Sequence, residues 1–308
     1  MSMDMNNLLE MAGVNGALQD PDTAHLAIDV HRVMSKNLVP GLQVETEEAE
    51  GVIRVRIRVE EGAHIHRPVH LCFGITHQQA QQLIDMDVEV GRKARIEVLS
   101  HCIFPRATDV RHQMQARIHV GEDASYRYLE KHIHSDRGGL AVYPSAQVEL
   151  ERGARFSTDF ELVRGRVGTL AIDYVLTGRY HSILEMVSRV NGRGDDDISI
   201  REVGYLVGEH ARGALTSRVA VRDRAQAQVY NKLRATAPHA RGHVDCKEII
   251  QDDGKATAIP IVEVVHPLAH VTHEAAIGSV DTKQLETLMA RGLDEDQATE
   301  LIIEGLLS

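Results

Sequence analysis

Apolar and polar residues alternate, as in β-strands, from residue 46 to residue 280 with few interruptions. This pattern is the feature that most restricts the folds open to the chain. Val52–Val59 alternates branched apolar side chains with arginines, as a strand with one buried face does. Short acidic or glycine-containing turns, each followed by a small residue and another alternating run, recur at residues 121–124, 151–154, 222–225 and 252–256. Short strands joined by such turns, with hardly a helix between them, favour an all-β fold.

The spacing of these turns is irregular, and both a β-sandwich and a β-helix satisfy the pattern. The content of large rings favours the β-helix, because the chain has no tryptophan, only four phenylalanines and seven tyrosines. A core made mainly of valine, isoleucine, leucine and alanine is thin, and a thin core suits a stacked solenoid better than a wide globule. We therefore expect a mainly β protein, with a solenoid as the favoured of two architectures.

The N-terminal segment, residues 1–45, is expected to be helical. In its second half, Leu26, Val30 and Val33 have the three-to-four residue spacing of an amphipathic helix, and a Pro-Gly pair would end that helix. A weaker helical pattern at residues 78–86 interrupts the strand region early. The β core would then occupy residues 46–280.

Residues 281–308 are expected to form two short helices appended to the β core. Asp281 is a good N-cap for the first helix, and Gly292 would stop it. Asp294 caps the second helix, with Gln297 three residues later as in a capping box. The apolar positions are Leu285, Leu288 and Met289 in the first helix and Ala298, Leu301, Ile302 and Leu306 in the second.

Charge and cysteine content exclude several classes of function. The formal net charge of −11 argues against general nucleic-acid binding, which requires the neutralisation of phosphates. No stretch approaches the roughly 20 apolar residues of a membrane span, and the polar N-terminus does not resemble a signal peptide. Three scattered cysteines, Cys72, Cys102 and Cys246, are too few for a disulfide framework. We therefore expect a cytoplasmic protein with reduced thiols that binds neither nucleic acid nor membrane.

Histidine is abundant, with 18 residues, and several lie close together, as His132 and His134 do. Although histidine can ligate metals, we interpret most of the 18 as polar side chains on strand surfaces. The sequence has no Walker-type phosphate loop, dinucleotide-binding glycine motif, serine-nucleophile elbow, His-Glu-x-x-His zinc helix or Cys-x-x-Cys pair. An ordinary enzyme signature is therefore absent, and a non-catalytic role is expected.

Four segments near the C-terminus resemble a known family. Residues 241–246 match its Arg-Gly-His-x-x-Cys element, residues 259–263 its Ile-Pro-x-x-Glu strand, and residues 271–275 its Val-Ser-His-Glu-Ala element. Residues 284–293 are similar to a family segment that ends in Leu-Met-Ser-Arg-Gly-Leu. In order and spacing, these elements resemble the SufB/SufD family of iron–sulfur cluster assembly proteins.

The resemblance implies a right-handed parallel β-helix, flanked by an N-terminal helical part and a short C-terminal helical domain. It also implies a scaffold of a SUF-type system, on which a transient cluster of the [4Fe–4S] type is built and then passed to apo-proteins. A SufC-like ABC-type ATPase would hydrolyse the ATP and contact residues 281–308, and the scaffold would form a homodimer. Reduced flavin could also act on the complex.

On the family pattern, the cluster would be held by Cys246, His273 and Glu274. Thiolate is the usual ligand of such clusters, and imidazole or carboxylate makes a site more labile, which suits a scaffold that gives its cluster away. Cys246 departs from the family pattern, since classical SufB chains have the cysteine near the position of Gly254. Adjacent strand residues point to opposite faces, so His273 and Glu274 can face one cluster only through a bulge or a dimer seam. Further candidates, expected mainly at the surface or around the ligands, are Glu263, His266 and His270.

Cys72 and Cys102 are expected to be buried strand residues. A second hypothesis for the whole chain, from another class of function, is a β-helical carbohydrate-active enzyme that uses a pair of carboxylates. Such an enzyme needs an aromatic-lined cleft, and this chain has few aromatic residues to line one. The scaffold is therefore the favoured hypothesis.

Overall fold

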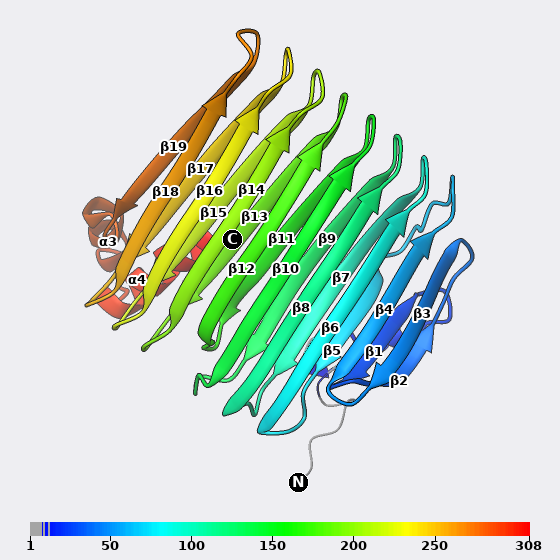
Figure 1. Cartoon of the computed structure of the whole chain (residues 1–308). Helices are drawn as coiled ribbons and strands as arrows, with labels where there is room; N and C mark the ends of the chain where they lie inside the picture. The colour runs from blue at the N-terminus through cyan, green and yellow to red at the C-terminus, as the bar shows by residue number, and fades with distance from the viewer. Residues whose placement is uncertain (1–7, 9, 12) are drawn as a thin grey trace.

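The protein is a long stack of strands, and Figure 1 shows this stack from the side. The computed structural model describes residue 8, residues 10–11 and residues 13–308. In spatial order, sheet A consists of β19 (His270–Gly278), β17 (Arg241–Ile250), β15 (Arg212–Val221), β13 (Ile183–Gly192), β11 (Arg155–Arg164), β9 (Ser125–His134), β7 (Arg95–Phe104), β5 (Val69–Gly74), β1 (His25–Asp29) and β2 (Arg32–Asn37). Sheet B consists of β18 (Lys255–Val264), β16 (Gln226–Ala235), β14 (Asp197–Leu206), β12 (Gly168–Gly178), β10 (Leu140–Leu150), β8 (Asp109–Val120), β6 (Gln79–Val90), β4 (Val52–Val59) and β3 (Leu42–Ala49). The helices are α2 (Asn15–Leu18), α3 (Thr282–Met289) and α4 (Glu295–Leu307).

From β4 onward, consecutive strands alternate between the two sheets, and each pairs in parallel with the strand two positions later. The chain is thus a parallel β-solenoid of about eight turns, which confirms the expected architecture. Arg212, Arg241 and His270 lie opposite one another at a spacing of 29 residues, whereas Ser125 and Arg155 are 30 residues apart. The turns differ in length by up to three residues, which is why the repeat looks irregular in the sequence.

One continuous apolar core fills the space between the two sheets. In β4 the apolar residues face this core, and the arginines face solvent, where Arg54 and Arg56 form ion pairs with Glu47 and Glu45 of β3. Branched aliphatic residues make up most of the core, as the shortage of aromatic residues indicated. The four phenylalanines of the chain are all buried in it: Phe73, Phe104, Phe156 and Phe160.

The helix expected in the second half of residues 1–45 is wrong. This segment forms an antiparallel hairpin of β1 and β2, followed by β3. Leu26 and Ile28 are buried at the two-residue spacing of a strand, and Val30 lies in the turn with a φ of 56°. The helix-like spacing of Leu26, Val30 and Val33 arises because the hairpin turn falls between apolar residues of two different strands.

The helix expected at residues 78–86 is also wrong, since these residues belong to β6. Ile84, Met86 and Val88 are buried at alternate positions of that strand. Pairing with β4 on one side and β8 on the other overrides the weak local pattern. Before residue 20 the described residues 8, 10 and 11 are helical, as expected there, and the short helix α2 follows. Residues 1–7, 9 and 12 lie outside the described residues.

The two C-terminal helices are confirmed, together with their caps. The Asp281 carboxylate accepts a hydrogen bond from the backbone N–H of Gln284, and Asp294 and Gln297 form the expected capping box. None of the helices in the described part of the chain is long and apolar enough to cross a membrane.

Helix α4 packs on the outer face of sheet A, and its buried residues coincide with the expected apolar positions only at Ala298. Ala298 and Ile303 are buried, with Ile303 against Ala220 of β15, whereas Leu301 is 48% exposed. Glu300 anchors the same helix by ion pairs with the arginines of two turns, Arg193 and Arg222. The helices therefore lie beside the last turns of the solenoid (Figure 1).

Two glycines offer a matched test of how tightly the turns are stacked. Gly139, which precedes β10, has a φ of +80°, and a Cβ added there would lie 2.3 Å from the carbonyl oxygen of Thr108 in the previous turn. We expect Gly139→Ala to destabilise the fold by about 2 kcal/mol or more, because backbone strain and a backbone clash add. Gly305 in α4 has open space around its Cα, and Gly305→Ala should stabilise by about 0.5–1 kcal/mol. The midpoints of urea unfolding of the two variants measure both effects. Equal shifts of the two midpoints would contradict the close backbone stacking at Gly139.

Candidate functional site

The solenoid ends on β18 and β19, and this last turn is referred to below as the open end. Each of the two strands is the edge strand of its sheet, and each has one neighbour in the described chain. Large apolar residues around the open end are exposed to solvent, although inside the solenoid such residues are buried. They are Val264 (48%), Val265 (60%), Leu268 (57%) and Ile277 (45%).

Cys246 lies on β17, one strand from the open end, and its side chain points into the core. The residue is fully buried, and burial raises the pKa of its thiol. It lies opposite Ser217 of β15 on one side and Ala275 of β19 on the other. The Asn231 side-chain amide of β16, across the core, lies 3.5 Å from Cys246 Sγ. The orientation that satisfies both ends of this amide directs its N–H to Glu202 and to the carbonyl oxygen of Tyr230, so its oxygen faces the thiol and accepts. The thiol is therefore held in a polar spot one strand beneath the edge.

Two buried carboxyl groups near Cys246 do not emerge from the sequence analysis. Glu202 of β14 accepts a hydrogen bond from the Ser188 hydroxyl, and burial raises the pKa of Glu202 to about 7. Burial also raises the pKa of Glu248 to about 7, and within the described chain neither of its carboxyl oxygens has a hydrogen-bond partner of normal geometry. Both residues occupy inward positions of their strands. In the sequence, Glu202 and Glu248 stand two residues from apolar residues that face the core. That spacing could have identified them as buried carboxyl groups.

His273 and Glu274 lie on β19, and the structure does not bring them to one face. His273 is opposite Val244, which points into the core, and Glu274 is opposite Asp245, which forms an ion pair with Arg218 outside it. The register of β17 and β19 is continuous, so no bulge turns one of them around. His273 therefore shares the inner face with Cys246, whereas Glu274 lies on the outer face of the edge strand.

The three further candidates lie outside the core. Glu263 of β18 forms ion pairs with Lys232 and Arg234, and its hydrogen bond with Lys232 lowers the pKa of the carboxyl. His266, in the turn after β18, accepts a hydrogen bond from the backbone N–H of Leu268. His270 begins β19 and is exposed. The structure thus places these residues at the surface, as expected.

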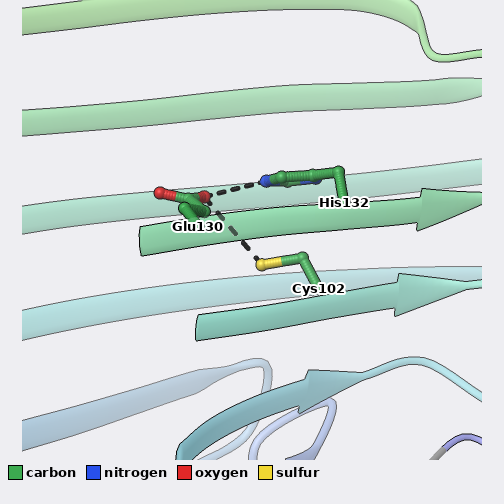
Figure 2. Close-up of side chains that lie close together, drawn as sticks. All are labelled: Cys102, Glu130 and His132. Atoms are coloured by element: carbon green, nitrogen blue, oxygen red, sulfur yellow. Dashed lines mark hydrogen bonds and ion pairs between the residues drawn. The ribbon is translucent and has the colours of Figure 1, made fainter. Parts of the chain in front are cut away.

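A second cluster of possible metal ligands lies in the core, in the N-terminal half of the solenoid (Figure 2). Cys102 Sγ of β7 is 3.9 Å from Glu130 Oε1 of β9, and this oxygen is 2.8 Å from His132 Nε2 of the same strand. Cys102 is buried as expected, but Glu130 and His132 are buried as well, so His132 departs from the interpretation of the histidines as surface residues. The signal in the sequence is that Glu130 and His132 occupy alternate, inward positions of β9.

Comparison with known proteins shows which family this chain belongs to. The family model described as the SufBD core domain of SUF system FeS cluster assembly matches residues 73–306. An iron–sulfur cluster assembly SufBD family protein of Methanocaldococcus jannaschii is 39% identical over 267 residues, which cover 87% of this chain and 84% of the relative. A SufBD family protein of Pyrococcus horikoshii is 34% identical over 295 residues, 96% of this chain and 90% of the relative.

A bacterial relative extends the comparison. The iron–sulfur cluster assembly protein SufB of Bacillus subtilis is 37% identical over 259 residues, which cover 82% of this chain and 54% of the relative. The family model spans more than half of the chain, and two relatives above 30% identity cover most of it. The chain therefore belongs to the SufBD family of iron–sulfur cluster assembly proteins.

Proposed function

We propose that this chain is a non-catalytic scaffold, on which an iron–sulfur cluster of the [4Fe–4S] type is assembled at the open end and then released to apo-proteins in the cytoplasm. The observation that carries the proposal is that Cys246 and His273 share the inner face of the last two strands of sheet A. A thiolate and an imidazole suit iron, and a mixed ligand set is labile enough to release its cargo. Family membership favours this function over a carbohydrate-active enzyme.

A second copy of the chain would complete the site. Within one chain Glu274 lies on the outer face of β19, so it cannot join Cys246 and His273 unless another edge strand brings its own residues to the seam. The open end suits such a contact, because β18 and β19 each leave one row of backbone groups unpaired in the described chain. Its exposed apolar residues would be covered by the same contact. The proposal is therefore a homodimer that pairs at the open end.

Cys246 must become accessible before it can bind a cluster, since it is fully buried. Only β19 lies between it and the end of sheet A. Displacement of this one strand would uncover the thiol. An ABC-type ATPase of the SufC kind could drive that displacement by pulling on α3 and α4, which follow β19 directly in the chain. ATP hydrolysis would belong to this partner, and reduced flavin could serve the same complex.

The C-terminal helices keep apolar residues free for this partner. In α4 Ala298 and Ile303 are buried, but Leu301 is 48% exposed, and α3 buries none of its residues while Met289 is 42% exposed. Exposed apolar residues on two short helices suit a groove on a folded partner. These helices are therefore the proposed contact with the ATPase.

Cys246→Ala should remove most of the iron and sulfide that the wild type retains after anaerobic reconstitution, because the thiolate is the ligand that water replaces least well. Iron and sulfide assays on the purified protein measure this. Cys72→Ala is the matched control, since Cys72 is also a buried strand cysteine, but lies on β5 at the other end of the stack. A Cys246→Ala protein that is folded and still fully loaded would place the cluster elsewhere.

Ala275→Pro tests pairing at the open end. His270 directs its backbone N–H toward β17, so by alternation the N–H of Ala275 points to the unpaired edge. Proline there keeps the ladder within the chain but removes a donor at the seam. We expect the wild type to be a dimer and Ala275→Pro to shift toward monomer by at least tenfold in dissociation constant, measured by light scattering. A wild type that stays monomeric with its ATPase bound would rule out the dimer.

Met289→Asp combined with Leu301→Asp should weaken binding of the ATPase at least tenfold, because charge is placed in an apolar contact. A pull-down with the purified ATPase measures this, and Val207→Asp is the control, since Val207 is equally exposed (44%) but lies after β14. Deletion of residues 282–308 should abolish binding. Undiminished binding by either folded variant would remove α3 and α4 from the contact.

A further inference from the structure

Four side chains with metal-binding atoms converge in the core between the two sheets, and together they are called the interior cluster below. Cys102, Glu130 and His132 come from sheet A, and His112 comes from β8 of sheet B. His112 Nε2 is 3.7 Å from Cys102 Sγ, which completes a chain of short distances through Glu130 Oε1 to His132 Nε2. All four residues are buried.

The hydrogen bonds behind His132 fix its tautomer. The carbonyl oxygen of Arg166 can only accept, so the His134 Nδ1 atom 3.2 Å away carries a hydrogen and donates it. In a neutral ring the other nitrogen, His134 Nε2, is then the acceptor, and it accepts a hydrogen bond from His132 Nδ1 over 3.1 Å. The lone pair on His132 Nε2 therefore faces Glu130 Oε1 at 2.8 Å.

The same logic fixes His112. The Gln82 side-chain amide donates its N–H to the carbonyl oxygen of Val30, which orients the amide so that its oxygen faces His112 Nδ1 at 2.8 Å. That oxygen accepts the hydrogen of His112 Nδ1, so the lone pair on His112 Nε2 points toward Cys102 Sγ. In both imidazoles a second residue thus holds Nδ1. The Nε2 atom of each faces another member of the interior cluster, Cys102 Sγ for His112 and Glu130 Oε1 for His132. This is the usual arrangement of histidines that bind a metal ion.

The carboxyl group is positioned in the same way. The Tyr174 hydroxyl donates a hydrogen bond to Glu130 Oε2 over 3.2 Å, which leaves Oε1 for the cluster. Glu130 and Cys102 are the two acidic groups of the interior cluster, and both are buried. Two protons would neutralise the interior cluster, one on each of these groups. One divalent cation in place of both protons leaves the same net charge in the core.

We propose that the interior cluster binds a single divalent first-row transition metal ion, Zn²⁺ or Fe²⁺, through Cys102 Sγ, Glu130 Oε1, His112 Nε2 and His132 Nε2. Binding would release the two protons of Cys102 and Glu130 and involve no change of oxidation state. Ligand atoms around a tetrahedral ion of this size lie about 3.3–3.8 Å apart. Cys102 Sγ, Glu130 Oε1 and His132 Nε2 all lie within 4.8 Å of one another, and His112 Nε2 is 3.7 Å from Cys102 Sγ, so the four atoms would draw together around the ion to reach that range. A thiolate with two imidazoles disfavours Mg²⁺ and Ca²⁺.

This site is independent of the proposed cluster site at the open end, and the two can be tested separately. The double variant Cys72→Ser, Cys246→Ser keeps Cys102 as the sole thiol of the chain. After treatment with a chelator, this variant is titrated anaerobically with Co²⁺ as the probe. We expect one Co²⁺ per chain, with the visible bands of a tetrahedral ion and a near-ultraviolet charge-transfer band from the Cys102 thiolate. A folded double variant without these bands overturns the proposal.

Gln82→Ala tests the geometry without changing a ligand. It removes the partner of His112 Nδ1 and should weaken Co²⁺ binding by about 10- to 100-fold. The matched control is Gln79→Ala, which changes an exposed glutamine of the same strand and should bind as the parent does. Equal affinities of the two variants would show that His112 takes no part. Loss of the charge-transfer band in the further variant Cys102→Ser confirms the ligand, and its persistence overturns the assignment.

Discussion

The pairing of each strand with the strand one turn later is the interaction on which the rest of this structure depends. Because the ladder is continuous through both sheets, a residue's position in the two-residue period decides whether it faces solvent or the core. A polar side chain at an inward position has no access to water, so any partner available to it lies inside the solenoid. Gln82 with His112, and Asn231 with Cys246, are such pairs. Chemistry inside this solenoid therefore consists of side chains from neighbouring turns and from the facing sheet.

The sequence predicted the strand region and the C-terminal helices well, because their signals are local. The alternation in Val52–Val59 and the caps at Asp281 and Asp294 depend on neighbours within a few residues. The hairpin at β1 and β2 was mistaken for a helix, since the spacing of Leu26, Val30 and Val33 does not reveal that a turn separates them. Choosing between sandwich and solenoid required pairs of residues about 29 positions apart, which no local pattern records.

For the candidate sites too, local or family patterns identified some residues, and those brought together only by long-range pairing were missed. The positions of Cys246, His273 and Glu274 were found through family resemblance, and the opposite orientation of the last two followed from strand geometry. The interior cluster was not found, because His112 belongs to the opposite sheet, and Cys102 and His132 become neighbours only through pairing of β7 with β9. Five strand spacings of sheet A separate Cys102 from Cys246, roughly 24 Å at about 4.8 Å per strand. The two sites therefore cannot share a ligand.

The single-sided attachment of β19 has a consequence for when the thiol beneath it can be reached. In a stack where each turn is stabilised only by its neighbours, interior turns are held from two sides and the terminal turn from one, so fraying begins at the end. Cys246 lies just inside that boundary and Cys102 lies deep within the array. Local unfolding of a few residues thus exposes one cysteine while the other stays sealed. The free energy of that small opening is the work needed to reach Cys246, and no hinge or separate moving domain is required for it.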